Sequence, residues 1–160
     1  MVDAARPPIP APPHRGGCLC GRVRYRIDAP PLAVSACHCN DCRKLTGVAN
    51  TQHVLFLREA FVHEQGETDI YGKTADSGRI SQIARCATCG VRLWHVPAAG
   101  PYIMATAGTL DDCAWVVPNA HIWIEKAPPG TAFTPDALMV EGQPAERETM
   151  IAHFAGLYGE

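Results

Sequence analysis

The placement of the cysteines constrains this sequence more than any other feature. Seven of the eight lie in three short clusters, and one, Cys113, stands apart. The clusters are C-x-C at residues 18–20, C-x-C-x-x-C at 37–42 and C-x-x-C at 86–89. Structural zinc takes four ligands, whereas catalytic zinc commonly takes three and keeps one position open. The count therefore predicts one closed metal site and a second site that is open to chemistry.

The two outer clusters supply four thiols for the closed site. Gly21 and Gly90 directly follow these clusters and can adopt the positive φ that turns backbone amides toward the sulfurs. Two pairs so far apart in sequence would join distant strands through one ion. We therefore expect a structural zinc site formed by Cys18, Cys20, Cys86 and Cys89.

The middle cluster offers three thiols within six residues, Cys37, Cys39 and Cys42. A zinc ion held by these three would accept water, a substrate thiol or a histidine as its fourth ligand. A second closed site of the Cys₃His type is the alternative, although the position of His38 between two ligands predicts that it points away. The histidines that could complete such a site are His38, His53, His63, His95 and His121.

The remaining cysteine and the bulk composition predict an ordinary globular chain in a reducing compartment. Nothing beside Cys113 would lower its thiol pKa, so we expect a small buried hydrophobe. No apolar run approaches the roughly 20 residues needed to span a bilayer, and the N-terminus lacks the apolar stretch of a secretory signal. We therefore expect a cytoplasmic protein with no membrane partner, in which clustered cysteines bind metal rather than form disulfides.

Charge disfavours nucleic acid as a partner. The formal net charge is −2, whereas binding to phosphate backbones needs a cationic surface. Arg22, Arg24 and Arg26 alternate along one expected strand, and we interpret them as a solvated face. Nothing in the sequence indicates an oligomeric state.

The pattern of residues predicts a mainly β fold. Residues 1–15 hold five of the fourteen prolines and are expected to form a disordered tail, followed by a single zinc-binding domain at 16–160. A short helix is expected at 40–46, with Asn40 or Asp41 as its N-cap and Gly47 at its end. Strands are expected at 23–27, 32–35, 52–57, 61–64, 68–71, 80–85, 91–96, 102–107 and 121–125. A C-terminal helix is indicated by the apolar stripe Met150, Ile151, Phe154, Leu157 and Tyr158.

Five segments in this order resemble the glutathione-dependent formaldehyde-activating (GFA) family. They are GGCLCGRVRY at 16–25, CHCNDCRKLTG at 37–47, CATCG at 86–90, GTLDD at 108–112 and PNAHIW at 118–123. The resemblance implies a β-tent of the Mss4-like type. It also implies a structural zinc on the first and last cysteine pairs and a catalytic zinc on the middle trio. The implied reaction is the condensation of formaldehyde with glutathione to S-hydroxymethylglutathione, formally a carbon–sulfur lyase reaction run backwards.

This chemistry suits the middle cluster, because coordination to zinc deprotonates a thiol at neutral pH. The resulting nucleophile would attack an aldehyde, and an acid would protonate the new alkoxide. Proton donors suggested by the sequence are His38, Asp41 and His53. A non-catalytic, zinc-stapled interaction or chaperone module is the main alternative. A methionine sulfoxide reductase of the B type is disfavoured because Cys113 lacks the Arg-x-Cys-x-Asn context of that class.

Overall fold

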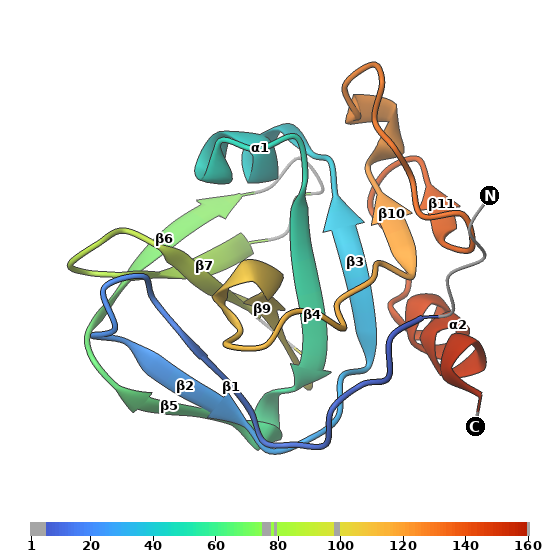
Figure 1. Ribbon diagram of the computed structural model, residues 1–160. Coiled ribbons are helices and arrows are strands. Elements are labelled where there is room, and N and C mark those ends of the chain that lie inside the picture. The colour runs from blue at the N-terminus through green and yellow to red at the C-terminus, as the bar shows by residue number, and fades with distance from the viewer. Residues whose placement is uncertain (1–5, 75–77, 79, 98–99, 160) are drawn as a thin grey trace.

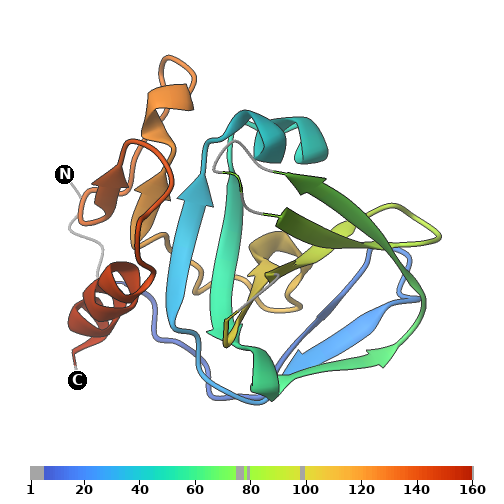
Figure 2. The same ribbon diagram turned by 180° about the vertical axis from the view of Figure 1, so that it is seen from behind.

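A computed structural model describes residues 6–74, 78, 80–97 and 100–159 of the 160-residue chain. Its described part contains two β-sheets, two α-helices and three short 3₁₀ turns (Figures 1 and 2). The strands are β1 His14–Gly17, β2 Arg24–Ile27, β3 Ala33–Cys37, β4 Thr51–Leu57, β5 Phe61–Gln65, β6 Thr68–Thr74, β7 Ile80–Cys86, β8 Arg92–Pro97, β9 Tyr102–Thr106, β10 Ala120–Ile122 and β11 Leu138–Val140. The helices are α1 Asn40–Thr46 and α2 Glu148–Tyr158, and the 3₁₀ turns are η1 Arg58–Ala60, η2 Ala107–Thr109 and η3 Ile124–Lys126.

The smaller sheet has the order β1-β2-β5 and is antiparallel throughout. The alternation expected from residue 23 onward is confirmed, since Tyr25 and Ile27 are fully buried. Arg24 and Arg26 lie on the opposite face, where both form ion pairs with carboxylates. The predicted solvated face of arginines is thus present on β2.

The larger sheet has the order β11-β10-β3-β4-β9-β8-β7-β6. Most of its pairs are antiparallel, and β10 runs parallel to both β3 and β11. The two sheets pack face to face through aromatic side chains. The ring of Trp94 on β8 lies 5.7 Å from that of Tyr25 on β2 and 4.8 Å from that of Phe61 on β5. A core of this kind between two sheets confirms the mainly β expectation.

Helix α1 has the bounds predicted from the sequence, but its N-cap is different. The Sγ of Cys39 accepts a hydrogen bond from the backbone N–H of Cys42 at 3.3 Å, so Cys39 caps the helix rather than Asn40 or Asp41. Gly47 ends it with φ 73°, as expected. The sulfur at the cap also belongs to the middle cysteine cluster, which ties the start of the helix to that cluster.

Helix α2 packs beside β3 through a fully buried amide. The Oδ1 of Asn119 accepts a hydrogen bond from the backbone N–H of Val34 at 2.7 Å, and its Nδ2 donates to the carbonyl of Met150 at 2.8 Å. On the apolar stripe of this helix, Met150 and Phe154 are buried and the other three residues are half-buried. The predicted C-terminal helix is confirmed.

The expected disordered tail at 1–15 differs from the structure in its second half. Residues 1–5 lie outside the described part, but His14 and Arg15 already belong to β1. The guanidinium of Arg6 donates to the carbonyls of Val117 and Pro118 at 2.9 Å each and pairs with Asp136 at 2.6 Å. The proline-rich composition did not predict these contacts, because they come from one arginine side chain and from the short strand β1.

Cys113 is exposed, so the expectation of a buried hydrophobe was wrong. The buried position of this loop belongs to Trp115, which is 2% exposed and donates from Nε1 to the carbonyl of Asp112 at 3.0 Å. The larger apolar side chain two residues later therefore fills the core in place of the thiol.

Candidate metal centres and the adjoining cavity

The four outer thiols meet at one end of the two sheets. Cys18 and Cys20 lie in the loop between β1 and β2, while Cys86 ends β7 and Cys89 follows in the turn before β8. All four Sγ atoms lie within 4.8 Å of one another, and all eight cysteines of the chain are free thiols. The turns after both pairs depend on glycine, because Gly21 and Gly90 have φ values of 74° and 73°.

The geometry of this outer cluster fits a tetrahedral metal. Zinc–sulfur bonds of about 2.3 Å place tetrahedral sulfurs about 3.8 Å apart. The Sγ of Cys20 lies 3.4 Å from that of Cys18 and 3.8 Å from that of Cys86. Burial raises the pKa of Cys18, but the backbone N–H of Val23 and the neighbouring thiols outweigh it and lower the pKa to about 6. The cluster thus already favours a thiolate at neutral pH.

The middle cluster is assembled by the turn from β3 into α1. Cys37 ends β3, Cys39 caps α1 and Cys42 lies in its first turn, with all three Sγ atoms within 4.8 Å of one another. Cys37 and Cys42 are buried and Cys39 is half-buried. One tight β–α turn therefore delivers three sulfurs to one point.

The middle thiols are electrostatically suited to a cation. Hydrogen bonds from the Cys37 and Cys42 thiols lower the pKa of Cys39 to about 2, and the same contacts raise the pKa of Cys37. In the bare protein, one thiolate therefore forms at the expense of its neighbours. Since three ionised sulfurs this close repel one another strongly, their joint ionisation needs a positive ion between them.

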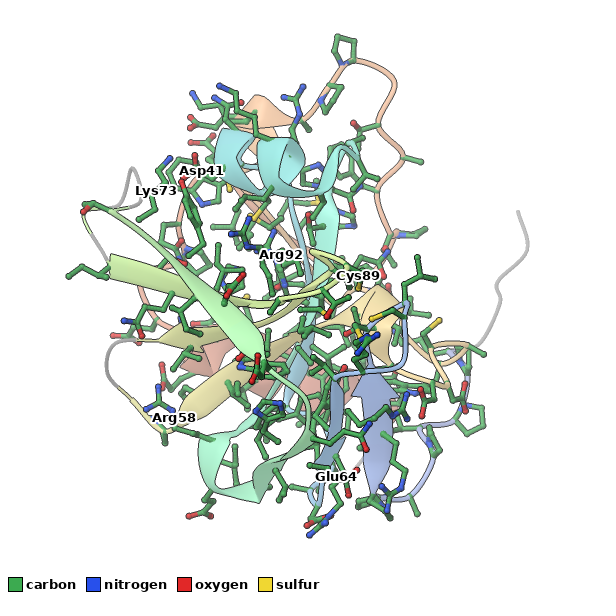
Figure 3. All side chains as sticks on the ribbon, turned by 90° about the vertical axis from the view of Figure 1, so that its left-hand side faces the viewer. Asp41, Arg58, Glu64, Lys73, Cys89 and Arg92 are labelled. Carbon is green, nitrogen blue, oxygen red and sulfur yellow. The ribbon has the colours of Figure 1, made fainter. Side chains whose placement is uncertain are left out.

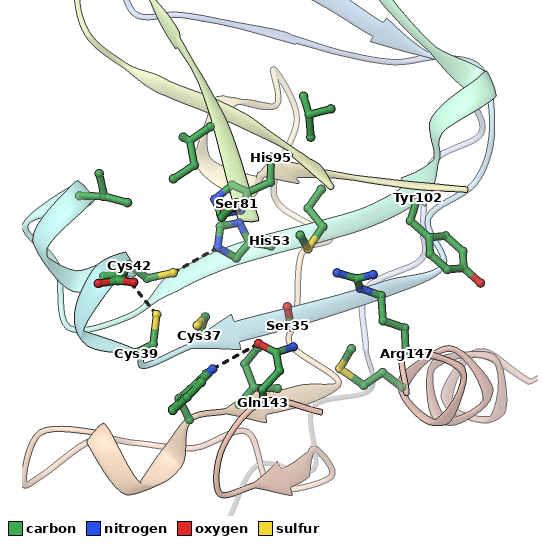
Figure 4. A pocket seen from close by; sticks show the side chains of 18 of the residues that line it. Ser35, Cys37, Cys39, Cys42, His53, Ser81, His95, Tyr102, Gln143 and Arg147 are labelled. Carbon is green, nitrogen blue, oxygen red and sulfur yellow. Dashed lines mark hydrogen bonds between the residues drawn. The ribbon is translucent and has the colours of Figure 1, made fainter. Parts of the chain in front are cut away.

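A cavity of about 700 Å³ opens onto this cluster (Figure 4). Cys37, Cys39 and Cys42 line it, while the outer cysteines do not. Its walls are largely apolar, with polar and charged groups at a few points. The apolar lining residues are Leu45, Ile80, Ile83, Val96, Tyr102, Met104, Ile122, Trp123, Ala145 and Met150. The polar and charged ones besides the cysteines are Ser35, Asp41, His53, Lys73, Ser81, Arg92, His95, Gln143, Glu146, Arg147 and Glu148.

Trp123 lines this cavity in a backbone conformation unusual for a large residue. Its φ of 58° lies in the left-handed region. Among the residues that the structure describes, every other residue with a positive φ is a glycine. Its indole Nε1 donates to Oε1 of Gln143 at 3.4 Å, the contact drawn as a dashed line in Figure 4. Backbone conformations of this kind cost free energy and cluster at functional sites.

The five histidines considered as a fourth ligand differ in how close they lie to the middle cluster. His53 on β4 comes nearest, with its Nε2 3.9 Å from the Sγ of Cys42. His95 lines the cavity, whereas His38, His63 and His121 do not. His38 points away as expected, since its Nε2 lies 3.0 Å from Nδ1 of His121 in a separate buried pair. Among the residues that the structure describes, the group that could bind a metal at this site consists of the three cysteines, without a histidine.

Of the three proton donors suggested by the sequence, Asp41 and His53 line the cavity and His38 does not. Asp41 pairs with Lys73 at the cavity wall, and Figure 3 shows these two side chains together. Burial lowers the pKa of His53 well below its ordinary value, and the charge of Arg92 adds to this effect. His53 is therefore a neutral imidazole at neutral pH.

Arg92 is the functional candidate that the sequence analysis missed. Its Nη2 lies 3.7 Å from the Sγ of Cys42 and 3.4 Å from Nε2 of His53, and it also contacts His95. Residues three apart on a regular strand point to opposite faces, yet Arg92 and His95 both line the cavity. A register shift between β7 and β8 explains this, since Arg85 pairs with Arg92 and Ala84 with Trp94. Bulges of this kind redirect side chains, and no sequence pattern here reveals one.

Known proteins resemble this chain over most of its length. Among the described residues, no helix is both long and apolar enough to cross a membrane. A curated protein of Halomonas elongata named "Putative glutathione-dependent formaldehyde-activating enzyme" is 29% identical over 120 residues, which cover 71% of this chain and 76% of that protein. The model of the family described as glutathione-dependent formaldehyde-activating enzyme matches residues 13–126, which include all seven clustered cysteines. The chain therefore belongs to the glutathione-dependent formaldehyde-activating enzyme family.

Proposed function

We propose that the protein is a zinc-dependent enzyme of the carbon–sulfur lyase type. It joins glutathione, or another small thiol, to an aldehyde such as formaldehyde. The observation that carries this proposal is the cavity of about 700 Å³ that is lined by the Cys37–Cys39–Cys42 cluster. A structural site would be closed by a fourth ligand, whereas this one faces a space large enough for a small peptide.

Two zinc ions are proposed, one for each cluster. Cys18, Cys20, Cys86 and Cys89 would hold the structural ion, and Cys37, Cys39 and Cys42 the catalytic one. Zinc bound by three thiolates offers a position for a further ligand and deprotonates a thiol that binds there. We place the protein in the reducing cytoplasm, where these thiols stay available.

The cavity supplies groups that suit a thiol carrying carboxylates. Arg147 and Lys73 line it together with the cysteines, and Figure 4 shows the guanidinium of Arg147 directed toward the cavity. Glutathione carries two carboxylates, for which a guanidinium and an ammonium are suitable partners. With its carboxylates near these cations, its sulfur would share the cavity with the three cysteines, and the aldehyde carbon would approach from the cavity.

The product alkoxide must receive a proton. His53 lines the cavity as a neutral imidazole, so it can take the proton that the thiol loses and pass it to the alkoxide. Asp41 also lines the cavity and is the second candidate, and His38 is set aside because it is buried against His121. Arg92 cannot act as an acid, since guanidinium keeps its protons, but its N–H groups can stabilise negative charge near Cys42.

The test measures thiohemiacetal formation from glutathione and formaldehyde, by NMR exchange spectroscopy, in the presence of zinc-loaded protein. The wild type should accelerate exchange above the buffer rate, and Cys39→Ser should not. Cys113→Ser is the matched control, because it removes an exposed thiol outside both clusters and should behave as wild type. Equal exchange with Cys39→Ser and wild type would contradict the proposed role of the middle cluster. Absence of catalysis by both would favour the zinc-stapled interaction module.

A further inference from the structure

Arg92 is a buried cation in the cavity wall. It is the first residue of β8 and is 6% exposed. The contacts of its Nη2 are a thiol sulfur and two imidazole nitrogens, none of which is a carboxylate. Its Nε and Nη1 are buried and have no hydrogen-bond partner within the described part of the chain. A buried charge is strongly destabilising unless an opposite charge lies close to it, so this position calls for an anion.

The titratable side chains around Arg92 show which group could carry the opposite charge. Guanidinium can only donate, so Nε2 of His53 accepts and the ring proton lies on Nδ1. Burial, followed by the charge of Arg92, also keeps His95 neutral by lowering its pKa to about 3. Asp41 is paired with Lys73, and the acidic lining residues Glu146 and Glu148 lie just before α2 and at its first position. Of the three groups in contact with Nη2 of Arg92, the sulfur of Cys42 is therefore the one that would carry a negative charge once the cluster binds a metal ion.

The contact between Arg92 and Cys42 matters for the net charge of the middle cluster with zinc bound. Three thiolates around a zinc ion leave about one net negative charge, and a fourth thiolate raises it to about two. In a buried site, the second charge would weaken binding of an anionic ligand, and a neutral ligand such as water would be favoured. A fixed cation 3.7 Å from one ligand sulfur offsets one of these charges.

We propose that Arg92 is a positioning residue that supplies the counter-charge of the Cys37–Cys39–Cys42 site, so that the site can hold a metal together with an anionic thiolate as fourth ligand. The inference rests on the proposed function for the identity of the fourth ligand. Its electrostatic part concerns only the metal and the three cysteines. Specificity for thiolate over neutral ligands would thus be set from the end of β8, and not by the cysteines alone.

The experiment compares zinc release from the loaded protein to a chromogenic chelator, together with calorimetric binding of glutathione. Arg92→Gln keeps hydrogen-bond donors but removes the charge, and Arg92→Lys keeps the charge. Lys44→Met is the control, because it removes one positive charge from an exposed position of α1, the helix that carries Cys42. Zinc in the outer cluster is an internal reference in every variant.

Arg92→Gln should lower the zinc affinity of the middle site at least tenfold and weaken glutathione binding more than binding of a neutral ligand such as imidazole. The zinc affinity of the outer cluster should be unchanged. Arg92→Lys should restore much of both properties, and Lys44→Met should match wild type.

Equal zinc affinity and equal glutathione binding in Arg92→Gln and wild type would overturn the inference. So would a failure of both Arg92→Lys and Arg92→Gln to fold, because Arg92 would then be a structural residue. A wild type that binds glutathione but catalyses no condensation would contradict the proposed function and leave the counter-charge role supported. Unchanged catalysis and unchanged zinc affinity in Arg92→Gln would contradict the counter-charge role alone.

Discussion

The Sγ atoms of Cys20 and Cys86 lie 3.8 Å apart, although the two residues are 66 positions apart in the chain. Cys20 belongs to the loop of the smaller sheet, and Cys86 ends a strand of the larger one. A metal ion bound between them would connect the two sheets directly. Closure of so long a loop is where a cross-link stabilises a fold most.

The first prediction follows from this connection. Cys89→Ser should yield insoluble or largely unfolded protein, because structural zinc contributes an apparent folding free energy of about 10–16 kcal/mol in zinc-finger peptides. Thermal unfolding monitored by circular dichroism is the measurement, and Cys113→Ser is the control. A soluble Cys89→Ser protein with the wild-type melting temperature would refute the structural role of the outer cluster.

A second prediction concerns the amide that joins β3 to α2. Asn119→Ala should lower the free energy of unfolding by about 2–4 kcal/mol, because the buried N–H of Val34 and carbonyl of Met150 both lose their partner. Chemical denaturation measures the change. Asn50→Ala, at a half-buried loop position, controls for the substitution itself. A change below about 0.5 kcal/mol in Asn119→Ala would show that water replaces both bonds.

The third prediction tests the docking of the N-terminal segment. Arg6→Ala should lower the free energy of unfolding by about 1–2 kcal/mol, since two bonds to backbone carbonyls and one partly exposed ion pair are lost. Lys126→Ala removes an exposed cation paired with its neighbour Glu125 and should change little. No change in Arg6→Ala would restore the expectation of a tail without stabilising contacts.

The same pair has a predictable pH dependence. The hydrogen bond from Arg6 lowers the pKa of Asp136 below its ordinary value of 3.8. A carboxylate with a lowered folded-state pKa stabilises the protein above the unfolded-state pKa and loses this contribution as the pH falls through the folded-state pKa. The difference in stability between wild type and Arg6→Ala should therefore be constant from pH 5 to 7 and shrink below about pH 4. A difference that grew on acidification would contradict the pairing.

The sequence was sufficient for the parts of the molecule that local spacing determines. The short intervals between cysteines, the glycines after them and the alternation around Tyr25 predicted the two clusters and the strand β2. Helix α1 was predicted with its exact bounds because Gly47 ends it in a conformation that few residues adopt. These features depend on residues that are close together in the chain.

The parts that the sequence did not reveal depend on pairing across the fold. Arg92 faces the middle cluster because a register shift in the larger sheet places it beside His95, and its neighbours in sequence give no sign of this. The strands β1 and β11 are short, and each forms by pairing with another strand, β2 and β10 respectively, so that their own residues did not predict them. Arg6 similarly acquires its role only when Val117 and Asp136 come within reach.

The most direct test of the central claim measures zinc content and glutathione binding in wild type and Cys42→Ser. The middle cluster spans only six residues, so its metal closes a small loop and constrains the unfolded chain little. We expect about two zinc ions per chain in wild type and about one in Cys42→Ser, which should remain folded by circular dichroism. Wild type should bind glutathione, and the variant should not. An unfolded Cys42→Ser protein, or one that retains both zinc ions and binds glutathione as wild type does, would contradict the account of an open catalytic site.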